Sequence, residues 1–173
     1  PETGGWLAAL AGLDVRAEPL LASAPIDEVV KARAELLLKV ALLRTLSQAG
    51  QRGSREAVYP VFEQAFVRDG LLRDECGRMV RAMGSPAIPG LIRIYNNRSK
   101  GNYKMRRYAS YQLDRMDRLR PSKAIAAASD DLVRADIIHA YGEVLAIDAV
   151  EAVLEQVEAR SRRVRREARW AWL

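Results

Sequence analysis

The sequence predicts an all-α protein, folded as a short α-α superhelix (a solenoid) of about four to five helix pairs. Apolar residues recur at three- and four-residue steps, the spacing of one helix face, and almost no segment alternates as a strand would. One phrase also recurs along the chain. It opens the segments VRADIIHAYG from Val133, VRREARWAWL from Val164, MRRYASYQL from Met105, LRDECGRMV from Leu72 and, more loosely, VKARAELLL from Val30.

The four phrases from Leu72 onward start 33, 28 and 31 residues apart, close to the length of a two-helix unit. Such a unit needs a partner helix before each phrase, and each phrase has one. The partner segments are AVYPVFEQAF from Ala57, AIPGLIRIY from Ala87, AIAAAS from Ala124 and AVEAVLEQV from Ala149.

Helix ends are predicted from capping residues. A Ser or Asp side chain at the N-cap accepts a backbone N–H of the first turn, and the candidates are Ser54, Ser85, Ser122 and either Asp130 or Asp131. Pro86 fits the first turn of a helix. Gly84 and Gly142 follow or close second helices, where a left-handed residue commonly ends a helix.

The chain divides into two parts in this prediction. Residues 1–25 form an N-terminal segment with a short capping helix, WLAAL, in which Trp6 covers the first apolar face. Residues 26–173 form the repeat domain, which begins with a helix over roughly 26–48. The last segment, ARWAWL, is apolar and lies inside a second-helix phrase, so we expect the domain to be part of a larger protein.

Two residue patterns recur in the pairs. A first-helix pattern is formed by Ala87, Ile88, Pro89, Leu91 and Ile92, and a second-helix pattern by Val133, Arg134, Ala140 and Gly142 and by Val164, Arg165, Ala168 and Ala171. They resemble the A-V-P-x-L and V-R-x-x-A-x-x-A-L-G patterns of the HEAT repeat family. The resemblance covers roughly residues 54–173, and residues 26–50 less closely. It implies a curved, armadillo-like α-solenoid whose second helices line the concave side.

Three features depart from the HEAT pattern. The first helix around Ala124 is short, Asp114 stands where Gly is usual, and residues 96–102 form a long polar connection.

The repeat has a physical reason. One helix pair cannot bury both of its apolar faces alone, so neighbouring pairs stack and share a core. The Val or Leu that opens a second helix packs towards that core, and the Arg beside it lies at an edge. There we expect it to bridge to an acidic residue of the next unit. Asp131 and Arg134, three residues apart, form a local version of this contact.

Composition limits the classes of partner and compartment. The formal net charge is +6, which weakly favours an acidic partner, and 23 of the 28 basic residues are arginines. No run approaches eighteen apolar residues, and the N-terminus lacks a signal-peptide pattern. We therefore expect a cytoplasmic protein that does not insert into membranes.

We expect no catalytic, cofactor or metal site. His139 is the only histidine and Cys76 the only cysteine, so a metal set based on either residue type cannot be assembled. His139 is predicted to be a partly buried helix residue and Cys76 a small buried hydrophobe. The chain has neither a glycine-rich phosphate loop nor a nucleophile elbow.

The expected partner-binding surface is basic and aromatic. Its candidate residues are Lys104, Arg106, Arg107, Tyr111, Arg134, Tyr141, Arg162, Arg163, Arg166 and Trp170. Residues 160–169 alone hold six arginines and one acid, Glu167. These arginines repel one another unless they are neutralised, by Glu151, Glu155 and Glu158, by an acidic protein partner, or by nucleic acid.

Three functions stay open. The main prediction is a non-enzymatic scaffold that binds an acidic protein or peptide. The alternative is a nucleic-acid-binding domain, including one like the HEAT-type DNA glycosylases, because arginines mixed with aromatics suit phosphate contact and base stacking. The third is an architectural segment that docks a neighbouring domain. A continuous arginine face would favour nucleic acid, whereas an apolar centre with a charged rim would favour protein.

Overall fold

The computed structural model describes residues 72–97 and 103–173, together with isolated positions before them from residue 34 onward. Within these residues every regular element is helical and no strand occurs, which confirms the all-α prediction. The elements are α4 (Arg73–Met83), α5 (Ile88–Asn96), α6 (Tyr103–Arg115), α7 (Pro121–Ala126), α8 (Asp131–Glu143), α9 (Val150–Leu154) and α10 (Arg162–Trp172), with the short 3₁₀ helices η3 (Ser85–Ala87) and η4 (Ile147–Ala149).

Several predictions fall on other parts of the chain. Residues 1–25 with Trp6, the cap at Ser54 and most of the connection 96–102 lie outside the described residues. In the helix predicted over 26–48, the positions that are described are helical, among them Val40 and Arg44. Val58 and Val61, from the segment that starts at Ala57, are helical as well.

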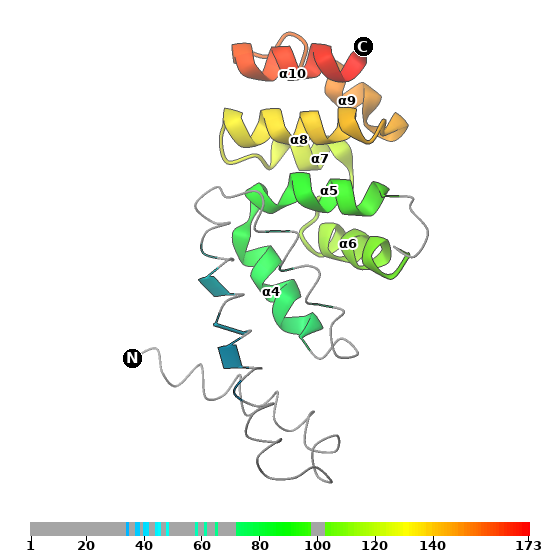
Figure 1. Ribbon diagram of the computed structural model, residues 1–173. Helices are drawn as coiled ribbons and strands as arrows, with labels where there is room; N and C mark the ends of the chain where they lie inside the picture. The colour runs from blue at the N-terminus through cyan, green and yellow to red at the C-terminus, as the bar shows by residue number, and fades with distance from the viewer. Residues whose placement is uncertain are drawn as a thin grey trace.

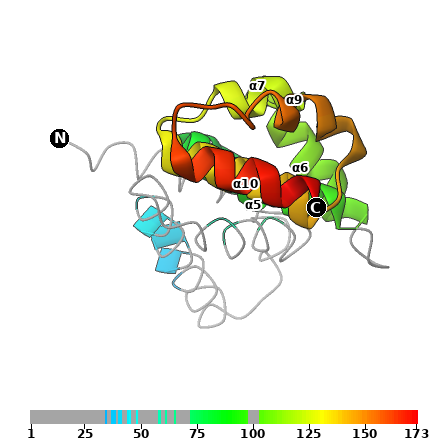
Figure 2. The same ribbon diagram turned by 90° about the horizontal axis from the view of Figure 1, so that it is seen from above.

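α5, α8 and α10 lie above one another in one row, and α7 and α9 lie beside that row (Figure 1, Figure 2). α8 packs on α5 on one side and on α10 on the other. α7 packs against α8 and α9, and α9 packs against α10. The pairs α7–α8 and α9–α10 are therefore stacked on each other, while α6 packs on α5 and also contacts α4.

The position of α5 differs from the simplest repeat. The sequence pattern makes α5 a first helix, yet it lies in the row with the second helices α8 and α10. Its composition explains this, because Pro89, Leu91, Ile92 and Ile94 are all buried and cover more than one side of the helix. α6, in contrast, has a polar residue, Gln112, among its three buried side chains. α5 is thus the helix that can bury apolar surface against both α6 and α8.

α6 and α8 repeat each other at a spacing of 28 residues. Each has 13 residues, and each ends in the same pair of backbone hydrogen bonds, a Schellman motif. The N–H groups of Asp117 and Arg118 donate to Asp114 and Leu113, and those of Leu145 and Ala146 donate to Gly142 and Tyr141. Asp117 and Leu145 hold the left-handed position of the motif, with φ of 56° and 50°.

Asp130 and Gly84 are confirmed as helix ends, whereas the prediction for Gly142 is wrong. Asp130 caps α8, because its carboxylate accepts the N–H of Val133 at 2.9 Å. Gly84 ends α4 with a φ of 70°, which suits glycine. Gly142 instead lies inside α8, and the left-handed residue after that helix is Leu145.

Ser85 and Ser122 are not N-caps. Ser85 begins η3, and its hydroxyl accepts the N–H of Ser129 at 3.1 Å. α7 begins at Pro121, directly before Ser122. Proline suits the first helical position and has no N–H that needs a cap, so the helix starts ahead of the serine. Pro86 does lie in the first turn of η3, as predicted.

Gly142 is required by the closeness of α8 and α10. A methyl group at this position would lie 2.7 Å from Cβ and 2.8 Å from Cα of Ala171, far inside ordinary contact distance. Val164 and Ala168 of α10 and Ile137 of α8 are fully buried in the same core. Small residues at the crossing therefore set the distance at which these two helices pack.

We predict that Gly142→Ala destabilises the protein by about 1–3 kcal/mol, because the added methyl group forces α10 away from α8. In an open helix the same change would stabilise by roughly 0.5–1 kcal/mol. Urea unfolding followed by circular dichroism measures the difference. Adding Ala171→Gly should recover part of the loss, whereas a gain in stability from Gly142→Ala alone would contradict the close contact.

Candidate functional site

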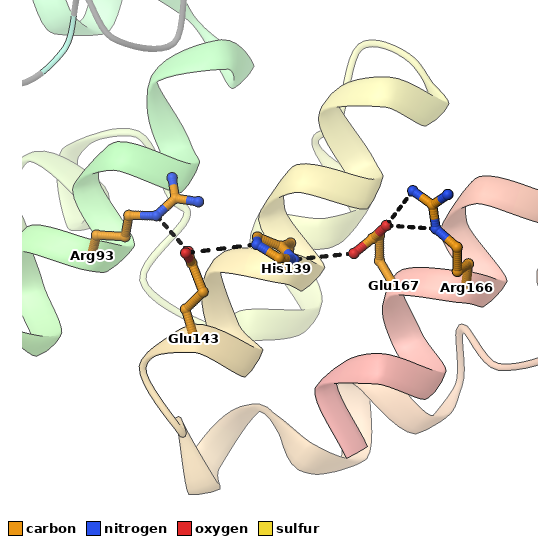
Figure 3. Close-up of polar contacts among 5 residues, drawn as sticks. All are labelled: Arg93, His139, Glu143, Arg166 and Glu167. Atoms are coloured by element: carbon orange, nitrogen blue, oxygen red, sulfur yellow. Dashed lines mark hydrogen bonds and ion pairs between the residues drawn. The ribbon is translucent and has the colours of Figure 1, made fainter. Parts of the chain in front are cut away.

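A polar row crosses α5, α8 and α10 (Figure 3). On α5, Arg93 Nε donates to Glu143 Oε2 of α8 at 2.6 Å. Also on α8, His139 places Nε2 3.6 Å from Glu143 and Nδ1 3.0 Å from Glu167 Oε2 of α10. Arg166 closes the row with two hydrogen bonds to Glu167 Oε1, the shorter of 2.7 Å. These five side chains link the three stacked helices on one side.

An aromatic contact accompanies the polar row. The imidazole of His139 stacks on the indole of Trp170, with ring centroids 4.3 Å apart and planes inclined by 23°. Trp170 follows Glu167 by three residues, so both side chains approach α8 from the same side of α10. The contact fixes the indole while leaving Trp170 46% exposed. His139 is half-buried, as the sequence predicts.

The polar row is close to charge balance. Partial burial pushes the pKa of the Glu167 carboxyl upward, but hydrogen bonds from Arg166 and His139 outweigh it and hold the pKa below its ordinary value. Glu167 is therefore ionised at neutral pH and accepts the Nδ1–H of His139. Because Glu143 and Glu167 flank opposite nitrogens of the ring, the three groups do not converge on one point. In the part of the chain that the structure describes, no three His, Cys, Asp or Glu side chains are placed to hold a metal ion.

The exposed arginines of α10 form a basic face, made of Arg162, Arg163, Arg166 and Arg169. Arg166 pairs with Glu167 of its own helix. Among the described residues, no ion pair or hydrogen bond involves the side chains of Arg162, Arg163 or Arg169. Within the same ranges, Glu151, Glu155 and Glu158 form no ion pair with α10. Most of this positive charge is thus left to solvent.

In two of the repeat phrases, the arginine that follows the first residue has a local role. Arg106 Nε donates to the carbonyl of Tyr95 at 3.1 Å, which ties the start of α6 to the end of α5. Arg165 donates to the carbonyls of Ala159 and Arg160, at 2.7 and 2.8 Å. These contacts stay within one helix pair, so the predicted bridges to acids of the next unit are wrong for them. The carbonyl that Arg106 contacts lies at the end of α5, and those that Arg165 contacts lie in the connection before α10.

Arg134 keeps the partner predicted from the sequence. Its Nη1 lies 3.4 Å from Asp131 Oδ1, three residues earlier on α8. This confirms the i,i+3 pair, which is exposed and therefore contributes little to stability.

The ten predicted partner-binding residues fall into two groups. Lys104, Arg106, Arg107 and Tyr111 lie on α6, and the other six lie on α8 and α10, with α5 packed between α6 and α8 (Figure 1). In the α6 group, Lys104 and Arg107 are exposed, and Tyr111 stacks on Tyr108 with ring centroids 6.3 Å apart. The structure therefore does not bring all ten into one continuous surface.

Tyr141 is placed differently from its prediction as a surface contact. It is only 6% exposed, because it lies on the core side of the last turn of α8. Burial first, and then the negative charge of Asp148, raise the pKa of its phenol. Tyr141 contributes to the wall of a hollow and not to an open face.

The hollow lies where the carboxyl ends of α8 and α10 meet η4 and α9. It has a volume of about 230 Å³, and apolar side chains dominate its wall, among them Tyr141, Leu145, Ile147, Val150, Val153 and Trp172. Leu145 is 82% exposed and Ile147 87% exposed. We call this feature the α8–α10 hollow. Exposed apolar side chains around one concavity mark a place where a partner can be bound.

The sequence carries a signal for the hollow in the connection after α8. Residues 144–147 read VLAI, directly after the last residue of α8. A connection between helices normally carries polar or turn-forming residues. Four apolar residues there indicate either burial or a binding surface, and the exposure of Leu145 and Ile147 favours the second.

Comparison of the chain with known protein families, with curated proteins and with solved structures finds no match. The HEAT pattern is thus a resemblance of the sequence alone. None of the helices in the described ranges combines the length and apolar character that crossing a bilayer requires.

Cys76 is placed as a buried hydrophobe, as predicted. Burial, reinforced by the charge of Glu75, raises the pKa of its thiol to about 12.

We predict that a thiol reagent at about pH 8 modifies Cys76 in the folded protein at least roughly 100-fold more slowly than in the protein in denaturant. Equal rates in the two states, followed by absorbance, would show that the thiol is open to solvent.

Glu167 links stability to pH. Its pKa is lower in the folded than in the unfolded chain, so its stabilising effect is complete above the unfolded pKa of about 4.3 and fades as the pH falls towards the folded pKa. We predict that Glu167→Gln lowers the free energy of unfolding by roughly 0.5–1 kcal/mol at neutral pH, with the difference shrinking below about pH 4.3.

Chemical denaturation at several pH values measures this difference. Glu158→Gln is the matched control, because Glu158 is exposed and forms no ion pair among the described residues. A Glu167→Gln effect that is absent, or that does not change with pH, would exclude a stabilising role for the carboxylate in the polar row.

Proposed function

We propose that the chain is a HEAT-like helical-repeat scaffold, a short α-solenoid without catalytic activity, that binds an acidic protein or peptide through α10 and the end of α8. The 28-residue recurrence of α6 in α8 and of α7 in α9 supports the repeat. Buried Ala124 and Ile125 of α7 recur as buried Ala152 and Val153 of α9. Units that bury equivalent positions against their neighbours are the basis of a solenoid.

The basic face of α10 carries the proposal. Arg162, Arg166 and Arg169 follow one another at four- and three-residue steps, so they lie along one side of the helix. Like charges at this spacing repel one another. Arg162 and Arg163 also lie at the N-terminus of α10, where the helix dipole is positive. A partner that carries carboxylates would offset both the repulsion between the arginines and their repulsion from the helix dipole. Exposed Trp170, held by His139, adds aromatic contact area beside the charges.

The surroundings favour a protein partner over nucleic acid. The α8–α10 hollow supplies an apolar centre beside the arginines, the arrangement typical of protein interfaces. Glu143 and Glu167 balance two of the cations in the polar row. Asp148 and Glu151 are exposed on η4 and α9, the elements that contribute Ile147 and Val150 to the hollow. A duplex laid over this end of the molecule would meet carboxylates as well as arginines.

We predict that Arg162→Glu/Arg163→Glu/Arg169→Glu weakens binding to a labelled acidic peptide roughly tenfold or more, because attraction becomes repulsion. These three side chains have no partners among the described residues, so the fold should be unaffected. Fluorescence anisotropy measures the affinity, and circular dichroism checks the helix content. Single- and double-stranded DNA, each at two salt concentrations, are titrated in parallel.

The matched control reverses three exposed cations of α6, Lys104→Glu/Arg107→Glu/Arg115→Glu, of which Lys104 and Arg107 belong to the other candidate group. It makes the same change in net charge and should leave peptide affinity within about twofold. Loss of binding in the α6 variant alone would move the site to α6. Strong, salt-dependent binding of DNA with weak binding of the peptide would replace the protein partner with nucleic acid.

A further inference from the structure

The α8–α10 hollow and the basic face are both built on α10. Trp172 contributes to the wall of the hollow, and Arg169 lies three residues before it on the same flank of α10. Arg166 and Arg162 continue the line towards the start of the helix. One ligand can therefore contact the apolar wall and several guanidinium groups at the same time.

The backbone at the rim of the hollow has a defined conformation. The Schellman motif at the end of α8 fixes Leu145 in the left-handed conformation, with a φ of 50°. Such a φ is unusual for a bulky residue, and glycine is the usual choice at this position. Here Leu145 and the neighbouring Ile147 are instead almost fully exposed at the rim. The structure thus maintains an apolar rim where glycine and polar residues would be easier to accommodate.

The size of the hollow indicates what fits. Its volume of about 230 Å³ is below the roughly 300–1,000 Å³ of pockets for drug-sized molecules, and suits one large apolar side chain. From Trp172 back to Arg162 the helix rises about 15 Å, at about 1.5 Å per residue. An extended peptide covers that distance with about five residues.

We propose that the α8–α10 hollow is the anchor site for the acidic partner: it takes one bulky apolar side chain of a peptide segment whose carboxylates, within about five residues of that side chain, pair with the basic face of α10. The inference rests on the proposed function and names the partner's chemistry. Charge complementarity selects this occupant. A second copy of the chain, docked symmetrically on the same surface, would place the α10 arginines against each other.

The test uses the 173-residue chain and two short labelled peptides. One peptide carries a Phe about five residues from a run of Glu, and the other has Ala in place of Phe. We expect the Phe peptide to bind the unmodified protein roughly 10- to 100-fold more tightly, the effect of burying one large apolar side chain. In Leu145→Gly/Ile147→Ser this preference should fall to less than about threefold. Both peptides should lose affinity in the α10 charge-reversal variant.

The variant is chosen so that misfolding does not imitate the result. Both replaced side chains are almost fully exposed, and glycine suits the left-handed position better than leucine, so the thermal midpoint should hold or rise. Asp117→Gly is the matched control. It makes the same backbone change at the equivalent end of α6, at a residue that does not line the hollow, and should keep the full preference for Phe.

The possible failures are distinguishable. Equal binding of the two peptides, both lost on α10 charge reversal, would overturn the anchor site and leave the proposed function standing. No binding of either peptide, or a preference for DNA, would overturn both. Concentration-dependent self-association that Leu145→Gly/Ile147→Ser abolishes, seen by light scattering, would assign the hollow to a second copy of the chain and overturn the anchor site.

Discussion

The contact between Gly142 and Ala171 sets the distance between α8 and α10, and the other features of this end of the molecule depend on it. At that distance His139 of α8 reaches Glu167 at 3.0 Å and stacks on Trp170, so a polar and an aromatic contact join the same two helices. The carboxyl ends of both helices also become walls of one hollow. Close packing, the polar row and the hollow therefore follow from one small residue facing another.

α10 divides its arginines between structure and surface. Arg165 satisfies two carbonyls at the turn before the helix, and Arg166 completes the polar row through Glu167. Arg162, Arg163 and Arg169 make no such contact in the described part of the chain. Arg165 is half-buried, whereas Arg166 and the three arginines without partners are exposed. That division gives the helix a binding surface without a loss of internal support.

Periodicity predicts the helices well, because the spacing of apolar residues reports which side of a helix is buried. Residue type predicted Gly84 as a helix end and the cap of α8 as either Asp130 or Asp131, of which Asp130 is the cap. The place of Gly142 was predicted wrongly, since a glycine near a helix end suits both a left-handed turn and a close crossing, and only the position of Ala171 decides between them. The same limit applies to the site. Arg106 and Tyr141 have the residue types of a binding surface, but one is held by the carbonyl of Tyr95 and the other is buried. Long-range packing decides which arginines and aromatics remain available.

The most direct measurement of the proposed surface is amide hydrogen exchange of the whole chain, with and without a saturating acidic peptide that contains one Phe. We expect added protection over residues 144–150 and 162–173, which form the hollow and the basic face, with little change over α6. Protection confined to residues 103–115, or no change anywhere in the presence of bound peptide, would contradict a binding surface built on α8 and α10.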